Sequence, residues 1–300
     1  MQTIEGLKRK IQSTEDLQSV VKTMKALAAV NIRQYERAVE SLKDYNKAVE
    51  MGLQVVLRDR PEFTVGARPA PHDRLGAAIF GTDQGMVGAL NEQVLSHAMA
   101  TMADLNVKHE DRTIMAVGER MMSLLEDAGQ PVEAFCSVPG SVAGITPMVQ
   151  ETLMNIESWN RERELDQIYL FYSIEVSGAA YQPHMIHLLP LDQDWLLNLK
   201  AVPWPSRGLP YFTMDWDRLF SSLIHEYLFI SLFRAFAESL ASENASRLAS
   251  MQGAERNIEE MLTELHANFQ QERQMSITEE LLDIMAGFEA LRKNGRSQMP

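Results

Sequence analysis

The chain has 300 residues, of which 45% are hydrophobic and 23% are charged, and these proportions are ordinary for a folded globular protein. Its formal net charge of −13 disfavours a nucleic-acid-binding protein, because such a protein needs a concentrated basic surface. The single cysteine, Cys136, excludes an intramolecular disulfide and suits a reducing compartment. The sequence contains no run of about eighteen apolar residues, so we expect no membrane span.

The first segment, residues 3–60, is predicted to form one long helix. It contains no proline, and apolar or small residues recur along it in steps of three and four. Such spacing over many turns is typical of a coiled-coil seam, and Pro61 is expected to end the helix. Leu17 and Met24 are assigned to this seam.

The middle segment, residues 61–214, has a different texture, because short apolar runs alternate with amphipathic stretches. Strands alternating with helices predict a small α/β domain, Rossmann-like, with a mainly parallel sheet. The predicted strands are residues 75–80, 113–117, 132–136, 168–174 and 185–189, with a further candidate at 196–202. The predicted helices are residues 91–105, 119–128 and 146–160, the last with Thr146 as N-cap and Pro147 at its first position.

The last segment, residues 215–291, is predicted to form a second, longer helix, again without proline. Its seam includes Leu248, Met251 and Ile258. At about 1.5 Å per residue the helix would span on the order of 100 Å, and a helix of this length needs a partner helix or a surrounding sleeve. Residues 292–300 are basic and polar and are predicted to be a disordered tail.

Together these segments predict an α/β insertion domain plus a long antiparallel α-helical coiled coil formed by the N- and C-terminal helices. In this division residues 1–60 and 215–291 form a shaft, and residues 61–214 form the inserted domain. Because the second helix is longer, part of it is expected to project beyond its partner.

Five segments, in chain order, resemble the gamma subunit of F-type rotary ATPases. Near the N-terminus, Leu7–Ile11 and Met24–Val30 are similar to two family motifs, and Thr82–Asn91 is similar to the family's SDRGLCG-G-x-N segment. Ala237–Met251 and Glu272–Leu291 resemble its two C-terminal signatures. The resemblance covers the whole chain. Gln84 and Val87 depart from the usual residues, which suggests a divergent branch such as the sodium-linked N-type.

The resemblance implies the function of a central rotor shaft. The implied partners are the alpha and beta subunits of a catalytic hexamer, the epsilon subunit and the membrane c-ring, with no nucleic acid and no direct nucleotide binding. The implied location is peripheral, at the cytoplasmic face of a bacterial or archaeal inner membrane. We expect no catalytic residue, no cofactor and no metal on this chain, and His184 and His187 would face opposite sides of their strand.

Two groups of side chains match family positions that contact the catalytic subunits. They are Arg273, Gln274 and Thr278 near the C-terminus, and Lys8, Arg9 and Lys10 near the N-terminus. For the first group the alternative is a solvated helix surface. For the basic cluster, an ordinary charged helix face is an equally good interpretation.

A glycine-containing turn follows the first predicted strand and precedes a helix. Its family-matched residues are Asp83, Gly85, Gly88 and Asn91. Such a turn could cradle a phosphate, but its spacing fits neither of the common phosphate-binding glycine motifs and no lysine follows. The resemblance assigns it instead to the foot of the shaft, which meets the epsilon subunit and the rotor ring.

Two other functions compete with the rotor shaft. The α/β domain could be an enzyme with the helices as a dimerisation stalk, and a nucleotide-dependent shift in melting temperature would favour this reading. The chain could instead be a passive coiled-coil scaffold, in which the seam matters and the terminal motifs do not.

Overall fold

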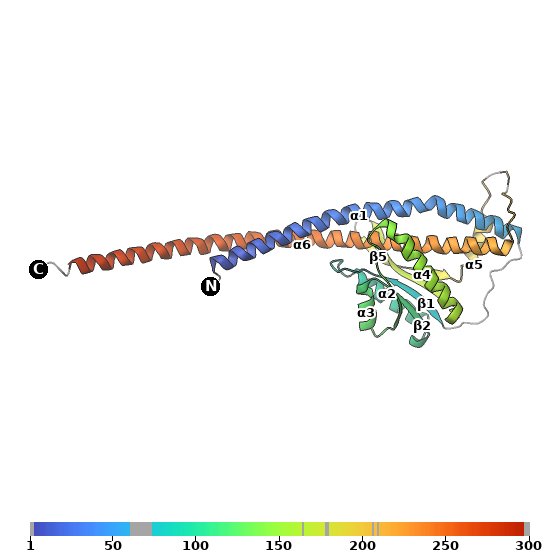
Figure 1. Ribbon diagram of the computed structural model, residues 1–300, viewed down its shortest axis with the longest axis horizontal. Coiled ribbons are helices and arrows are strands. Elements are labelled where there is room, and N and C mark those ends of the chain that lie inside the picture. Colours follow the sequence, from blue (N-terminus) through green and yellow to red (C-terminus); the bar gives the residue numbers. More distant parts are fainter. Residues whose placement is uncertain are drawn as a thin grey trace. The chain divides into compact units, whose positions relative to one another are not determined.

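The computed structural model describes residues 3–60, 74–163, 165–177, 180–205, 207–208 and 210–296. The chain forms two compact units, which are described separately. The helical unit comprises Met1–Ala26 and Met251–Pro300, and the sheet unit comprises Leu27–Ser250. Two long helices, α1 (Ile4–Asp59) and α6 (Trp216–Arg296), belong to both units (Figure 1). The predicted long terminal helices are thereby confirmed.

The compact units do not follow the predicted division at residues 60 and 215. Tyr35 of α1 and Leu232 and Phe236 of α6 are buried in the same core as the sheet. Burial of apolar area therefore joins residues 27–59 and 216–250 to the α/β fold. Coiled-coil periodicity alone could not show which part of a helix packs against another helix and which part packs against the sheet.

The sheet unit contains one five-stranded mixed sheet in the order β3-β2-β1-β4-β5. Its strands are β1 (Leu75–Phe80), β2 (Arg112–Val117), β3 (Val132–Cys136), β4 (Gln167–Ser177) and β5 (Ala180–Leu189). The strands β1 to β4 run parallel to one another, and β5 is antiparallel to β4. The prediction of a mainly parallel sheet is confirmed.

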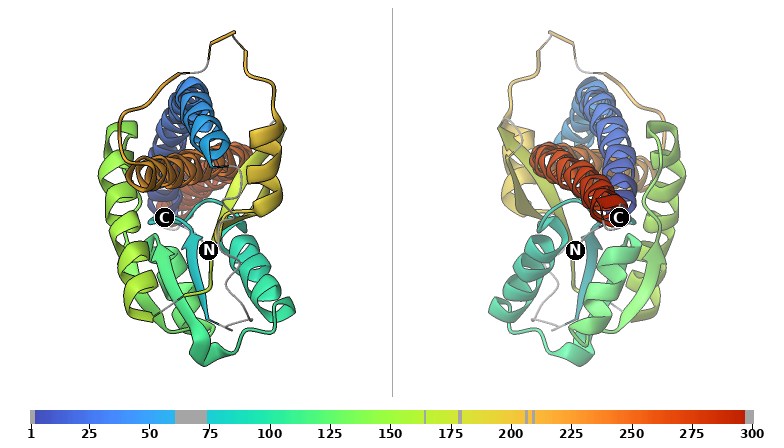
Figure 2. Two further views of the ribbon diagram at one scale, coloured as in Figure 1. Left: turned by 90° about the vertical axis from the view of Figure 1, so that its right-hand side faces the viewer. Right: turned by 90° about the vertical axis from the view of Figure 1, so that its left-hand side faces the viewer.

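Helices cover both faces of this sheet (Figure 2). Successive residues of β1 point to opposite faces, as the pleat requires. Ala77 and Ile79 pack with α2 (Leu90–Asp104) and α3 (Glu119–Asp127). Ala78 and Phe80 pack with α4 (Val142–Arg163) and with the sheet-unit parts of α1 and α6. A short 3-10 helix, η1 (His109–Asp111), precedes β2.

Two predictions in this domain are wrong. Helix α4 begins at Val142 rather than after Thr146, so Pro147 lies inside it, because the first turn is drawn into the core by the fully buried Ile145. Residues 196–202 do not form a strand. They belong to α5 (Gln193–Ala201), whose N-cap Asp192 accepts a hydrogen bond from the Asp194 N–H at 2.8 Å.

Helices α1 and α6 pair antiparallel within each unit. In the helical unit Val21 packs with Met251 and Ile258. In the sheet unit the Asn31 and Asn244 side chains meet at 3.3 Å, and the Trp216 indole donates to the Val56 carbonyl at 2.9 Å. Asp215 caps α6 by accepting N–H bonds from residues 217 and 218.

The assignment of Leu17 to the seam is wrong, because its side chain is 52% exposed. Leu7, Thr14, Val21 and Ala28 are buried at strict seven-residue intervals. A second set of seam positions, three or four residues away, contains Ile11, Gln18 and Lys25. Leu17 precedes the true seam position by one residue, or about 100° around the helix. Met251 and Ile258 are buried in the seam, and Met24, one residue before Lys25, is half-buried against them. Leu248 is half-buried.

The C-terminal helix extends further than predicted. It continues through Arg296, whereas the sequence suggested a disordered tail from residue 292. Residues 297–300 lie outside the described part of the chain. No proline occurs between residues 211 and 299, and a single glycine at 295 does not end a helix.

One described helix meets a length-and-composition criterion for a membrane span, which the sequence analysis did not expect. An 18-residue window within Trp216–Gly287 has a mean hydropathy of 1.2. Core helices of soluble proteins meet the same criterion, so this is weak support for a span.

Candidate partner-contact surfaces

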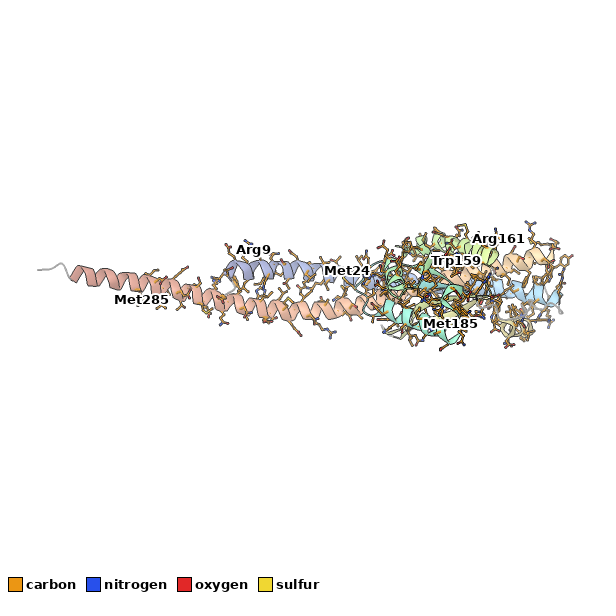
Figure 3. All side chains as sticks on the ribbon, turned by 90° about the horizontal axis from the view of Figure 1, so that it is seen from below. Arg9, Met24, Trp159, Arg161, Met185 and Met285 are labelled. Atoms are coloured by element: carbon orange, nitrogen blue, oxygen red, sulfur yellow. The ribbon has the colours of Figure 1, made fainter. Side chains whose placement is uncertain are left out.

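The basic cluster at the start of α1 lies beside the seam of the helical unit. Lys8, Arg9 and Lys10 are all exposed, while Leu7 next to them is 1% exposed. Figure 3 shows Arg9 on the outer surface of α1. The cluster lies in the second turn of α1, which begins at Ile4, so the dipole of the helix acts on it only weakly. Within the described part of the chain none of the three side chains forms an ion pair, and a partner could reach them.

The C-terminal part of α6 is bare. Every described side chain from Ile277 to Gly287 is exposed, and Figure 3 shows Met285 on this stretch. The expectation that part of α6 projects beyond its partner is confirmed within the helical unit. We call residues 273–287 the bare segment.

The predicted contact residues Arg273, Gln274 and Thr278 lie on and at the start of this segment, and all three are exposed. The Thr278 hydroxyl donates to the Gln274 carbonyl at 2.8 Å, so its oxygen can still accept a bond. In the described residues the Arg273 and Gln274 side chains make no hydrogen bond or ion pair. The structure thus places these three groups where a partner could reach them.

The bare segment has two different faces. Within it, continuing the α6 seam by its seven-residue repeat leads to polar positions, namely Ser276, Glu279 and Asp283. Four large apolar side chains are spaced i, i+4, i+7 and i+8 and fall on another face, at Ile277, Leu281, Ile284 and Met285. Met275 and Leu282 are also exposed but lie outside this face. The apolar face is therefore not an unpaired remnant of the α1–α6 seam. It is a separate surface that a further partner could cover.

The foot motif forms an internal clasp in the sheet unit. Asn91, 4% exposed, accepts a bond from the Thr82 N–H at 3.1 Å and donates to the Thr82 hydroxyl oxygen at 3.0 Å. The Thr82 hydroxyl in turn donates to the Gln84 carbonyl at 2.7 Å. These bonds fix the turn between β1 and α2 at the carboxyl end of the sheet.

Asp83 occupies the place where an anion would bind in a nucleotide-binding fold. Its carboxylate accepts N–H bonds from Glu119, the first residue of α3, and from Val138, each at 3.1 Å. The strand order reverses beside β1, which is where such folds hold their ligands. The N-terminus of α3 therefore already has an internal carboxylate, which disfavours a phosphate at this position.

The same turn joins the sheet to α6. The Ser246 hydroxyl donates to the Val87 carbonyl at 2.5 Å. Gly88 adopts the left-handed region with φ of +57°, and a Cβ there would lie 3.8 Å from the Ser250 hydroxyl oxygen. At Gly85 a Cβ would meet nothing within 4 Å. Gly88 is thus required by its backbone conformation, whereas Gly85 is not required by packing.

A buried ion pair near this joint was not singled out from the sequence. The Glu243 carboxylate and the Arg247 guanidinium meet at 2.5 Å, with 9% and 14% of their side chains exposed. Burial raises the pKa of Glu243, and Arg247 opposes that rise. Burial raises the pKa of Tyr35 on α1, and the nearby Glu243 carboxylate raises it further. The i, i+4 spacing of opposite charges was a readable signal, but it is more common on exposed helix faces.

The two histidines of β5 do face opposite sides of the sheet. His184 packs edge-to-face with Tyr172 at 5.3 Å, and His187 stacks on Tyr169 at 4.7 Å. Within the described ranges no group of three or more His, Cys, Asp or Glu side chains could hold a metal ion.

Paired terminal helices, a bare helical end and an inserted α/β domain define the chain as a helical-shaft protein. A family model described as ATP synthase matches residues 3–291. The chain belongs to this family, in its gamma-chain branch.

Named relatives agree along nearly the whole chain. The ATP synthase gamma chain of Polynucleobacter asymbioticus is 24% identical over 97% of this chain and 100% of its own length. The gamma chain of Syntrophus aciditrophicus is 26% identical over 98% of this chain and 100% of its own length. The gamma chain of Pasteurella multocida is 27% identical over 95% of this chain and 98% of its own length.

Solved structures show the same fold at lower identity. A chain of the Euglena gracilis mitochondrial ATP synthase, in an OSCP/F1/c-ring structure, aligns with a TM-score of 0.65 and 16% identity, covering 99% of this chain and 96% of its own. A chain of the Tetrahymena thermophila central stalk and c-ring aligns with a TM-score of 0.57 and 22% identity, covering 78% and 99%. The predicted fold class is confirmed by both.

Proposed function

We propose that this gamma-type chain is the central rotor shaft of a rotary F-type ATP synthase or ATPase. The observation that carries the proposal is the bare segment of α6, on a chain that belongs to the gamma family from residue 3 to residue 291. An 81-residue helix with eleven consecutive exposed residues, 277–287, needs a surrounding partner to cover its apolar face.

The shaft couples its partners through differential binding. Its bare segment is acidic on one face and apolar on another, so a ring of identical neighbours meets different chemistry on different sides. A shaft that binds one conformation of a neighbour more tightly than another shifts that neighbour toward the favoured conformation. Rotation would pass this bias from one neighbour to the next and couple ion translocation to ATP synthesis or hydrolysis.

The partners follow from the relatives. We infer that the chain assembles with alpha and beta subunits of a catalytic hexamer, with an epsilon subunit and with a membrane c-ring. It would then be a peripheral part of a membrane-associated complex, at the cytoplasmic face of a bacterial or archaeal inner membrane. The chemistry would reside on the other subunits, and the internal carboxylate of Asp83 at the N-terminus of α3 supports this reading.

Replacing the three predicted contact residues tests the proposal. The variant Arg273→Ala, Gln274→Ala, Thr278→Ala is expected to fold normally, because all three side chains are exposed, but to lower ATPase and ion pumping of the reconstituted complex at least about tenfold, as loss of about 1.4 kcal/mol of coupling would do. A control with Gln270→Ala and Gln271→Ala, also exposed on α6, should retain activity. Undiminished turnover in the triple variant would favour a passive scaffold.

The basic cluster provides a second, separable test. We propose that Lys8, Arg9 and Lys10 meet an acidic surface of the catalytic subunits. Their combined replacement by Gln should slow assembly at low salt and matter less at high salt, because exposed charges are screened. A salt-independent effect would contradict this assignment. The sodium-linked branch stays a prediction, and sodium stimulation of the complex's ATPase tests it.

A further inference from the structure

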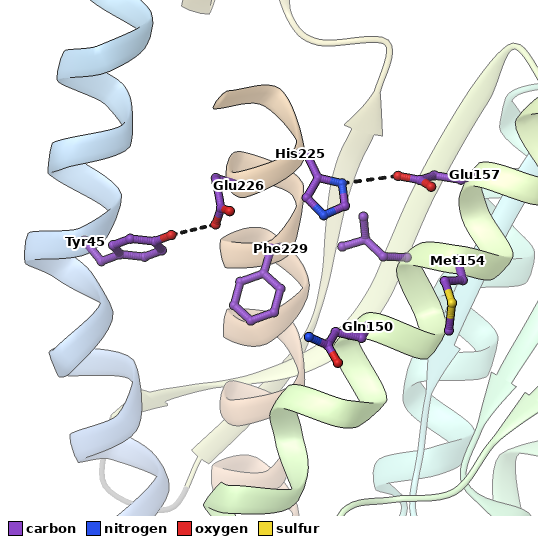
Figure 4. A pocket seen from close by; sticks show the side chains of 8 residues that line it. Tyr45, Gln150, Met154, Glu157, His225, Glu226 and Phe229 are labelled. Carbon is purple, nitrogen blue, oxygen red and sulfur yellow. Dashed lines mark hydrogen bonds and ion pairs between the residues drawn. The ribbon is translucent and has the colours of Figure 1, made fainter. Parts of the chain in front are cut away.

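A groove in the sheet unit runs over α6 between α1 and α4 (Figure 4). Helix α6 forms its floor through His225, Glu226 and Phe229, while Tyr45 of α1 stands on one side and α4 on the other. The cavity volume is about 540 Å³. None of the residues that line it belongs to the contact motifs discussed above, so its chemistry is independent of the proposed rotor function.

Part of the lining is apolar. Leu153 is buried at 3% exposure and Phe229 is half-buried, while Met154 beside them is 63% exposed. An exposed methionine can adapt its flexible thioether to an incoming apolar side chain. The groove therefore offers an apolar base with one mobile side chain at its wall.

The rest of the lining is acidic. Glu226 accepts a bond from the Tyr45 hydroxyl at 2.6 Å, and Glu157 pairs with the His225 ring at 3.2 Å. A carboxylate has about four acceptor sites, so each retains capacity for another donor. Tyr45 holds one carboxylate toward α1, and His225 lies beside the other at α4. Among the described residues that line the groove there is no lysine or arginine.

We propose that this groove docks an amphipathic helix of a partner protein that carries lysine or arginine beside its apolar residues. The α4 wall supplies Gln150, Met154 and Glu157 at i, i+4 and i+7, which extends the contact over about two turns. A docked amphipathic helix would place its own anchors at i, i+3, i+4 and i+7 against this wall. Apolar residues would cover Met154 and Phe229, and cationic side chains would reach Glu157 and Glu226. The two carboxylates select a basic partner over an acidic one.

Synthetic peptides and a thiol probe test the proposal with the full chain. The probe carries Met154→Cys in a Cys136→Ser background, and the matched control carries Val176→Cys at a site 55% exposed outside the groove. An 18-residue helical peptide with leucines on one face and flanking lysines should slow labelling of the groove thiol at least tenfold. It should leave the control thiol unaffected. Absence of protection, or equal protection at both sites, would overturn the proposal.

Charge selection is tested by matched variants and a matched peptide. The same peptide with glutamate at every lysine should bind at least tenfold more weakly. Glu157→Gln with Glu226→Gln should remove that preference, whereas Glu126→Gln with Asp127→Asn, which removes as much charge from exposed positions on α3, should keep it. An equal loss of the preference for the lysine peptide in both variants would show that the overall acidity of the chain, and not the groove, causes it, and would overturn the proposal. Disulfide-linked dimers of the Met154→Cys chain without peptide would identify a second copy as the occupant and overturn the proposal.

Discussion

Two stretches of the same helix, α6, show what the two units demand of a sequence. From Leu228 to Ser246 no residue is exposed, and from Ile277 to Gly287 every residue is exposed. The first stretch is filled with small and apolar residues that pack on the sheet, and its Ser242 and Ser246 hydroxyls donate to sheet-unit carbonyls. The second alternates acidic and apolar faces. One helix thus acts as a domain core along part of its length and as an unpaired surface along another.

The largest expected change in stability follows from breaking the buried ion pair between Glu243 and Arg247. Glu243→Ala leaves the Arg247 charge buried without its partner and should lower the free energy of unfolding by about 3–5 kcal/mol. The control Glu40→Ala removes a pair whose side chains are 66% and 68% exposed, and should change stability by less than about 0.5 kcal/mol. Urea denaturation measures both, and similar small losses would contradict the burial of the pair.

Substitutions at Val21 and at Leu17 should differ in their effect on stability, because only Val21 is buried in the seam of the helical unit. Val21→Ala removes a side chain that is 5% exposed and should cost about 1–3 kcal/mol through lost burial and a cavity. Leu17→Ala changes a side chain that is 52% exposed and should cost less than about 0.5 kcal/mol. Thermal unfolding followed by circular dichroism compares them. A larger loss of stability in Leu17→Ala than in Val21→Ala would show that Leu17 belongs to the seam.

Alanine substitutions at the two glycines of the turn between β1 and α2 should have different effects on stability, because only Gly88 has a left-handed backbone conformation. Gly88→Ala forces a side chain into the left-handed region and should lower stability by about 1–2 kcal/mol. Gly85→Ala, which meets no neighbouring atom within 4 Å, should be close to neutral or slightly stabilising. Hydrogen exchange of the 82–91 amides provides the measurement. Equal protection in the two variants would show that the turn tolerates the strain.

The smallest expected effect is a pH dependence at Glu238. Burial raises the pKa of this carboxyl, although the Tyr172 hydroxyl donates to it at 2.9 Å. A raised pKa means that the folded state favours the neutral acid, so this stability is present at low pH and is lost as pH rises through the folded pKa.

Glu238→Gln keeps a neutral acceptor for Tyr172 at every pH. The variant should therefore melt at a slightly higher temperature than the parent at pH 7, and the difference should vanish below the usual pKa of 4.5. Glu126→Gln, at an exposed position, should show no such crossover. A melting difference that does not change with pH would rule out titration of Glu238 as its cause.

The sequence by itself determined the long-range plan of this protein. Proline-free segments with seven-residue repeats specified two long helices, and short apolar runs between turns specified β1 to β4, because these signals depend on local periodicity. The motif around Asp83 and Asn91 could be located in the sequence, but its function as a clasp could not, since Glu119, Val138 and Ser246 lie far from it along the chain.

Only the tertiary structure decided which face of each helix is covered. Leu17 is exposed although it is apolar, because the register of α1 against α6 is set by all seam positions together. The first turn of α4 is helical because Ile145 reaches the sheet core, and residues 193–201 are helical because Trp195 and Leu199 pack against other helices. The acidic groove over α6 exists only where three helices distant in sequence meet. Local pattern sets what each segment can be, and burial against distant residues selects what it becomes.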